Sequence, residues 1–161
     1  MATTIKPADL TVTIAESVLL NGFEQGTTNT YTISDVNEVQ RRIINCNGSL
    51  ETTLIKFGPY GAGASRGPEI HVDDVRYLRI TNLDDTNYAT LRFQGSASTD
   101  YSFRLDPTGS HLLMTTQDSG SDDAGVTNYS DISGINLEDL KSIRAIANSA
   151  SVDLELFVAS I

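Results

Sequence analysis

Apolar and polar residues alternate along the C-terminal segment, where Val152, Leu154, Leu156 and Val158 are separated by single, mostly polar residues. Successive side chains of a β-strand point to opposite faces, so an alternation with period two predicts a strand with one buried face. We therefore expect these residues to lie in the core. The same alternation recurs in residues 77–81, 88–93 and 101–105.

Further extended segments lie in the N-terminal part of the chain. Leu10, Val12 and Ile14 alternate with threonines, and β-branched residues favour strands. Gly22 and Gly26 then bracket a turn, because glycine accepts backbone angles that other residues avoid. We expect strands at residues 10–14, 30–33 and 52–57.

Residues 34–45 allow two interpretations. Ser34 and Glu38 lie near the positions of a helical capping box, with apolar residues at helical spacing behind them. The adjacent pair Ile43-Ile44 and the strands expected on both sides favour a strand instead. We predict a strand and keep the helix as the alternative.

The clearest predicted hairpin joins residues 77–81 to residues 88–93. The connecting residues 82–87 are rich in Asn and Asp, which favour turns. Arg79 and Arg92 would then stand on the outer face of the hairpin. The residues expected to face the core from these two strands are Leu78, Ile80, Ala89, Leu91 and Phe93.

Turn-forming residues separate the remaining segments. Asp106-Pro107-Thr108-Gly109 has the composition of a β-turn. Residues 58–68 are rich in Gly and Pro, and residues 115–136 are rich in Ser, Asp and Gly, so both predict long exposed loops. Further strands are expected at residues 111–114 and 143–147.

Together these segments predict an all-β chain that folds as one domain over residues 1–161. About eight or nine strands, closely spaced turns and no long amphipathic helix fit a single-domain antiparallel β-sandwich. We expect jelly-roll-like connectivity with long polar loops. Residues 1–9 are expected to form an extended N-terminal arm.

The chain is acidic, with 21 Asp and Glu against 11 Lys and Arg and a formal net charge of -10. This balance argues against nucleic acids and anionic membranes as partners, because such partners are met by clustered basic residues. Cys46 is the only cysteine, so the chain forms no internal disulfide. The segment Met1–Pro7 lacks the apolar core of a signal peptide, and we expect synthesis in a reducing cytoplasm.

Residues 58–65 contain the nearest approach to a phosphate-binding loop. Gly58 and Gly63 have the required spacing, but Ala64 stands where the phosphate-binding lysine is needed. Pro68 also argues against a helix directly after the loop. We therefore interpret this segment as an exposed loop and assign no cofactor to it.

Acidic residues gather in the segment 118–123, where three carboxylates are suited in principle to Ca²⁺. The spacing of an EF-hand is missing, since Tyr129 occupies the twelfth position, where a glutamate is required. We interpret the segment as a solvated acidic loop. The pairs Asp73-Asp74 and Asp84-Asp85 are interpreted as turn residues, and no metal site is predicted.

Residues suited to nucleophilic catalysis are few. His71 and His111 are the only candidate general bases, and Ser110 next to His111 with Asp106 nearby suggests a triad. Neighbours on a strand point to opposite faces, however, so Ser110 and His111 are not expected to meet. Cys46 lies in an apolar segment and is expected to be a core residue. We predict no catalytic, cofactor-binding or metal-binding residue and no enzymatic activity.

Sugar-binding sites usually present aromatic platforms, and the chain contains no Trp. Four tyrosines in or near expected loops keep a glycan-binding role open as a minor alternative. They are Tyr60, Tyr88, Tyr101 and Tyr129.

Three segments of the C-terminal half carry a resemblance to a known class of proteins. The first is residues 75–93 and the second is residues 101–114. The third is the closing strand, which ends in Val158-Ala159-Ser160. This strand–turn–strand pattern resembles small β-sandwich virion proteins of tailed bacteriophages. The likeness is to capsid decoration, or cement, proteins and to related head or tail accessory proteins.

The resemblance implies a non-enzymatic structural protein that binds the outside of the assembled capsid and stabilises it. It implies the major capsid protein as partner, a homotrimer as the assembly, and the capsid surface of a virion assembled in a bacterial cytoplasm as the location. The alternative is a receptor- or glycan-binding module of a phage fibre or tail. A hydrolase with an acidic pair ranks third, because no pair of carboxylates is singled out by its spacing.

Overall fold

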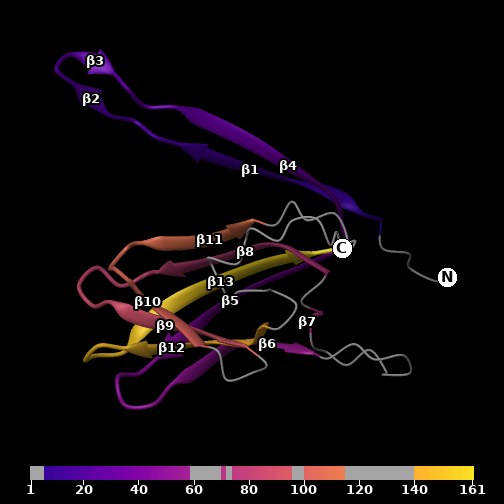
Figure 1. Ribbon diagram of the computed structural model, residues 1–161, viewed down its shortest axis with the longest axis vertical. Helices are drawn as coiled ribbons and strands as arrows, with labels where there is room; N and C mark the ends of the chain where they lie inside the picture. Colours follow the sequence, from indigo (N-terminus) through magenta and orange to yellow (C-terminus); the bar gives the residue numbers. More distant parts are fainter. Residues whose placement is uncertain (1–5, 59–69, 72–73, 96–99, 115–139) are drawn as a thin grey trace, which may run out of the picture.

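The computed structural model describes residues 6–58, 70–71, 74–95, 100–114 and 140–161, and its elements are all β-strands (Figure 1). In chain order the strands are β1 (Ala8–Ala15), β2 (Leu19–Leu20), β3 (Phe23–Glu24), β4 (Thr28–Val36), β5 (Glu38–Cys46), β6 (Thr52–Gly58), β7 (Ile70–His71), β8 (Val75–Asn82), β9 (Ala89–Gly95), β10 (Asp100–Leu105), β11 (Ser110–Met114), β12 (Leu140–Ala147) and β13 (Val152–Ser160). The predicted all-β class is confirmed.

Two sheets pack face to face to form a β-sandwich (Figure 1). One is four-stranded with the order β11-β8-β13-β5, and the other is five-stranded with the order β10-β9-β12-β6-β7. All pairs in these sheets are antiparallel except that of the short strand β7 with β6. The predicted antiparallel sandwich is therefore confirmed.

The connectivity is that of a jelly roll. The chain changes sheet between β5 and β6, β7 and β8, β8 and β9, β10 and β11, β11 and β12, and β12 and β13. In one sheet β13 lies between β5 and β8, and in the other β12 lies between β6 and β9. Late strands thus lie between early ones in both sheets, which is the arrangement of two Greek keys.

The predicted hairpin of residues 77–81 and 88–93 is wrong as a pairing, although both strands exist. β8 lies between β13 and β11 in one sheet, and β9 lies between β12 and β10 in the other. The apolar residues of the two strands therefore face each other across the core instead of lying side by side. A period of two tells which face of a strand is buried but does not identify the neighbouring strand.

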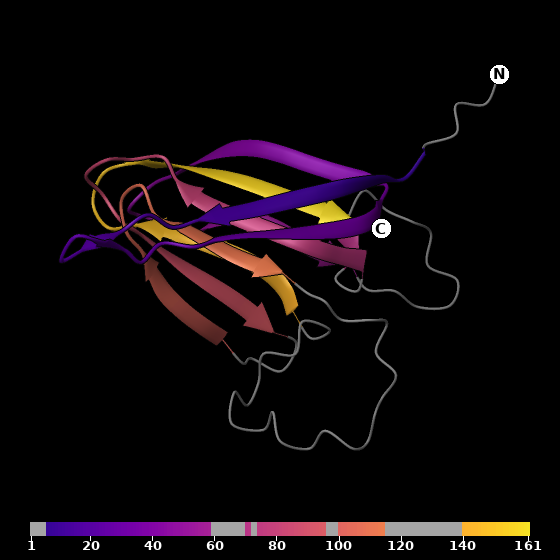
Figure 2. The same cartoon turned by 90° about the horizontal axis from the view of Figure 1, so that it is seen from above.

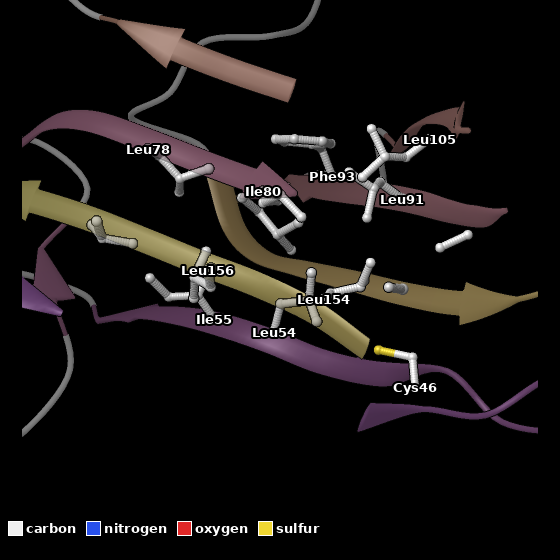
Figure 3. Close-up of a cluster of buried hydrophobic side chains, with 14 of the residues drawn as sticks. Cys46, Leu54, Ile55, Leu78, Ile80, Leu91, Phe93, Leu105, Leu154 and Leu156 are labelled. Atoms are coloured by element: carbon white, nitrogen blue, oxygen red, sulfur yellow. The ribbon is translucent and has the colours of Figure 1, made fainter. Parts of the chain in front are cut away.

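The core between the sheets contains the residues predicted from the C-terminal alternation. Val152, Leu154, Leu156 and Val158 are at most 1% exposed. Figure 3 shows side chains from both sheets meeting there, with Leu154 and Leu156 opposite residues of β6 and β9. The predicted core residues of β8 and β9 are buried in the same cluster: Leu78, Ile80, Ala89, Leu91 and Phe93.

Strands β1 to β4 form a long hairpin outside the sandwich, which we call the hairpin arm (residues 8–36). β1 pairs with β4, and β2 pairs with β3 at the tip. Figure 1 shows the arm leaving the sandwich near the C-terminus and its tip standing away from both sheets. The extended segments predicted at residues 10–14 and 30–33 are strands, but they do not belong to the sandwich.

The ambiguous residues 34–45 are extended, and the helical alternative is wrong. β4 ends at Val36 and β5 begins at Glu38, so the arm is joined to the sandwich by a single short link. Asp35 has a left-handed backbone with φ of 63°, and the amide of Asn37 donates to the carbonyl of Ser160 at 3.0 Å. This bend turns the chain from the arm into the four-stranded sheet.

The base of the arm packs on the outer face of the four-stranded sheet. Ile33 and Val36 are buried against Tyr77 and Ala159. Seen from above, the arm follows the long direction of the sandwich strands (Figure 2). The partly buried residues that complete this contact are Leu10, Val12, Leu112 and Phe157.

Candidate functional site

The two faces of the hairpin arm differ in chemistry. The register of β1 and β4 places Leu10 opposite Ile33 and Val12 opposite Tyr31 on one face. The other face pairs threonines with threonines, including Thr13, whose hydroxyl lies 3.3 Å from that of its partner. We call the first surface the apolar face of the arm and the second its threonine face.

Only the base of the apolar face is covered. Leu10 and Ile33 reach the sheet, whereas Ile14 and Tyr31, farther along the same face, are exposed. The tip is more exposed still, and Leu19 and Phe23 retain 70% and 71% of their accessible surface. Large apolar side chains gathered on one protruding element mark a surface for interaction.

The tip has a defined backbone that presents these apolar residues. Asn21 and Gly22 have φ values of 52° and 83°, as a tight two-residue hairpin turn requires. The Glu24 carboxylate accepts hydrogen bonds from the amides of Val18 at 3.1 Å and Gly26 at 2.8 Å. A Cβ atom at Gly26 would collide with the carbonyl oxygen of Glu16, so this position requires glycine.

An ion-pair cluster lies on the outer face of the four-stranded sheet beyond the arm base. The Glu155 carboxylate accepts hydrogen bonds from Arg79 and from Arg41, whose Nε lies 2.8 Å from Oε2. Hydrogen bonding from Arg41 lowers the pKa of Glu155, burial opposes this shift, and the hydrogen bond and charge of Arg79 lower the pKa further. The charge of Glu155 is thus stabilised beneath two guanidinium groups.

Two exposed apolar residues flank Arg41 on β5, the edge strand of this sheet. Val39 is 53% exposed and Ile43 is 60% exposed. The register of β5 with β13 places both on the same face as Arg41 and Glu155. We call Val39, Arg41 and Ile43 the β5 surface.

The outer face of the five-stranded sheet is polar where β9 and β12 meet. Arg92 and Arg144 lie opposite each other and share the Glu51 carboxylate, at 2.8 Å and 3.4 Å. Arg92 also contacts Asp100 at 3.0 Å. This part of the outer face is therefore charged, unlike the apolar surfaces of the arm and of β5.

The suggested triad does not form. Ser110 is on the outer face, where its hydroxyl lies 2.8 Å from that of Thr81, and His111 points into the sandwich against Phe103. Asp106 forms an ion pair with Arg104 instead. Burial lowers the pKa of His111, which favours the neutral imidazole at this apolar position.

Cys46 lies in the core with no exposed surface, as its apolar surroundings predicted. Burial raises the pKa of its thiol. A neutral thiol is a poor nucleophile, so this position is suited to packing.

Asp84 organises the turn between β8 and β9. Its carboxylate accepts hydrogen bonds from the amides of Thr86 at 2.8 Å and Asn87, which lower its pKa. The side chain of Asn82 adds a hydrogen bond to the carbonyl of Asn87 at 2.9 Å. The interpretation of Asp84 as a turn residue is confirmed.

Several candidate sites lie outside the described residues: residues 59–65 of the glycine-rich segment, the acidic segment 118–123, Asp73, Tyr60 and Tyr129. Within the part of the chain that the structure describes, no three His, Cys, Asp or Glu residues are placed to hold a metal ion. Nor does that part contain a helix long and apolar enough to cross a membrane.

The two described tyrosines of the glycan hypothesis differ in environment. The Arg104 guanidinium lies 4.0 Å from the centre of the Tyr88 ring and covers it. Tyr101 is 48% exposed and packs against Phe93 and Phe103 at the open side of the sandwich. Of these two tyrosines, Tyr101 is therefore the one with a free aromatic surface.

Comparison of the chain with protein-family models, with curated proteins and with solved structures finds no match. The function must therefore be argued from the arm and the β5 surface themselves. Sequence reasoning missed both surfaces. The available signal was the continuation of apolar residues at the turn, in Val18-Leu19-Leu20 and Phe23, where a turn within a soluble sandwich is usually polar.

Proposed function

We propose that the chain is a non-enzymatic structural protein of a bacteriophage virion that binds the outside of the assembled capsid as a homotrimer and stabilises it. The observation that carries the proposal is the hairpin arm, whose apolar face is covered by its own sandwich only at the base and which ends in an exposed apolar tip. Such a surface suits a protein that works by joining other folded proteins.

The jelly-roll fold fits both the capsid role and the glycan-binding alternative. Jelly rolls occur in viral capsid proteins and in lectins, so the fold supports the alternative as well. Two points favour the capsid role. Residues 75–114 resemble small virion proteins, and the sequence predicts synthesis in a reducing cytoplasm, where capsids assemble. The acidic composition, with a net charge of -10, argues against a direct role in packing DNA.

The stabilising mechanism would be mass action on the assembled lattice. A protein that binds only the assembled capsid stabilises it by about 2.7 kcal/mol per site at a hundredfold excess over its Kd. A trimer presents three copies of its capsid-binding surface to a repeating lattice, so the second and third contacts form at high effective concentration.

The proposal is tested with purified capsids of the phage whose genome encodes the chain. Capsids lacking the protein are heated with and without it, and their disruption is followed by light scattering. We expect the protein to co-sediment with capsids, not with dissociated capsid subunits, and to raise the disruption temperature. Absence of co-sedimentation, or an unchanged disruption temperature at saturating protein, would contradict the proposal.

The receptor- or glycan-binding alternative is favoured by one observation, the free face of Tyr101 beside Phe103 and His111. Aromatic faces at the open side of a jelly roll are suited to stacking on sugar rings. This alternative predicts glycan-array binding and adsorption to host cells, both reduced by Tyr101→Ala. No binding in either assay would remove it.

A further inference from the structure

We infer that the hairpin arm of one copy packs its apolar face and tip across the β5 surface of a second copy. The receiving residues are Val39, Arg41 and Ile43, and the inserting residues are those of the arm beyond its base. The inference rests on the homo-oligomer included in the proposed function: it assigns the arm to the contact between copies, and capsid binding is tested separately.

The first argument is continuity with the contact already present inside one chain. The base of the arm buries apolar residues against Tyr77 and Ala159 on the outer face of the four-stranded sheet. The apolar face of the arm continues outward through Ile14 and Tyr31, and the same sheet face continues to β5. The exposed part of the arm's apolar face and the β5 surface are thus continuations of the two surfaces that already pack together at the arm base.

The two surfaces cannot meet within a single copy in this conformation. Figure 1 shows the tip, formed by β2 and β3, standing well away from β5, which lies in the sheet beside β13. A second copy is needed to bring an arm to each β5 surface.

The second argument is reach. Eleven residue steps from Leu10 to Asn21 span about 36 Å at about 3.3 Å per residue. Four strands at a spacing of about 4.8 Å make a sheet about 19 Å wide. An arm anchored at its base on one sheet is therefore long enough to cross the outer face of a neighbouring sheet.

The third argument is charge. Residues 8–36 include Asp9, Glu16, Glu24 and Asp35 but no Lys or Arg. The β5 surface carries Arg41, whose side chain is 67% exposed and whose guanidinium has donors beyond the two that bind Glu155. An acidic arm with an apolar face matches a surface in which an exposed guanidinium is flanked by Val39 and Ile43.

The backbone supplies a further reason. An isolated two-stranded hairpin is marginally stable in water, so the distal half of the arm needs a cover to be well ordered. Among the described strands, β5 pairs only with β13, and its opposite edge is open. The open edge leaves the β5 surface accessible from that side, so an arm from another copy can reach it.

The contact joins two different surfaces, so it is heterologous. Each copy contributes one arm and one β5 surface, and the chain of contacts closes when the rotation between copies allows a ring. A closed trimer would use every arm and every β5 surface once.

Sedimentation velocity on the full-length protein tests the inference with two variants, Phe23→Asp in the tip and Ile43→Asp on β5. Both residues are exposed, so the sandwich should keep its unfolding midpoint. We expect the wild-type protein to sediment as an oligomer and each variant to weaken self-association at least about tenfold, because a buried charge would replace an apolar contact.

The controls are Thr13→Asp on the threonine face of the arm and Leu50→Asp, an exposed leucine outside both surfaces. Both should remain oligomeric. Mixing Phe23→Asp with Ile43→Asp should produce a one-to-one dimer, because the intact arm of the second variant can still bind the intact β5 surface of the first. A monomeric wild type, oligomeric Phe23→Asp or Ile43→Asp variants, or a mixture that stays monomeric would overturn the inference.

The capsid assay distinguishes this inference from the proposed function. An oligomer that fails to bind capsids would leave the arm contact standing and contradict the capsid role. A monomer that stabilises capsids would overturn the arm contact and the homotrimer, and would leave the capsid-stabilising role standing.

Discussion

The sandwich and the hairpin arm have the same sequence pattern and opposite surroundings. In both, apolar residues alternate with polar ones along antiparallel strands, as in Leu154-Glu155-Leu156 of β13 and Leu10-Thr11-Val12 of β1. The apolar face of β13 meets the second sheet and is fully buried, whereas that of the arm is covered only at its base. Periodicity therefore indicates which face requires burial but leaves open whether the cover comes from the same chain.

The largest effect should come from truncating the sandwich core. Leu154→Ala removes a fully buried side chain from a strand that has neighbours on both sides, and we expect it to lower the free energy of unfolding by about 2–5 kcal/mol. Leu19→Ala in the exposed tip should change it by less than about 0.5 kcal/mol in dilute solution. Urea unfolding at low protein concentration measures both, and similar losses would contradict the contrast between the two regions.

The buried side chain of Asn82, which anchors the turn between β8 and β9, should give the next effect. The side chain of Asn82 donates to the carbonyls of Asn87 and Asp106 and accepts from the amide of Asp84 at 3.0 Å. Asn82→Ala would leave these groups unpaired in the sandwich, and we expect a loss of about 1–3 kcal/mol in the free energy of unfolding. Thr86→Ala in the exposed part of the same turn is the matched control and should cost much less.

The ion-pair cluster on the outer sheet face should contribute less than the core. Glu155→Gln removes the charge that pairs with Arg41 and Arg79, and we expect a loss of about 1–2 kcal/mol near neutral pH, since Arg41 is largely exposed. The pKa of Glu155 is lowered in the folded protein, so its contribution is present above its ordinary pKa of 4.5 and is lost as the pH falls through the folded pKa. A wild-type to variant difference that persists unchanged at pH 2 would contradict this assignment.

The smallest effect should be a pH dependence that arises at His111. Burial lowers the pKa of this imidazole below the ordinary 6.5, so the unfolded chain takes up the proton first. Its contribution to stability is complete above pH 6.5 and is lost as the pH falls below that value. We expect His111→Phe, which keeps a ring beside Phe93 and Phe103, to flatten the slope of unfolding free energy between pH 7.5 and 5. If the slope of unfolding free energy against pH is unchanged in the variant, the proton uptake does not arise at His111.

Most of the strands could be predicted from the sequence, whereas the errors concern which strands pair with each other. The strands containing Leu10, Leu78, Leu91 and Leu154 were all expected, because each carries a period of two. The predicted pairing of β8 with β9 was wrong, because turn-forming residues such as those at 82–87 can connect strands of two different sheets as well as neighbouring strands of a hairpin. What a strand pairs with depends on long-range packing that no local window contains.

The candidate site was harder to predict. Each uncovered residue, such as Ile14 or Ile43, belongs to a segment whose alternation is equally suited to a core strand. The exposed tip residues Leu19 and Phe23 were the only local indication, because a soluble turn seldom carries several large apolar side chains. The correct prediction that Ser110 and His111 point apart needed only the geometry of one strand.

Hydrogen–deuterium exchange of the intact protein at two concentrations tests the central claim most directly, namely that the sandwich is complete in one copy whereas the arm is covered by another. The concentrations should lie on the order of tenfold below and tenfold above the Kd of self-association. We predict that amides of β8 and β13 are protected at both concentrations, and that amides of β1 and β4 beyond the arm base gain protection only at the higher one. Arm amides with the same protection at both concentrations, whether high or low, would contradict the account.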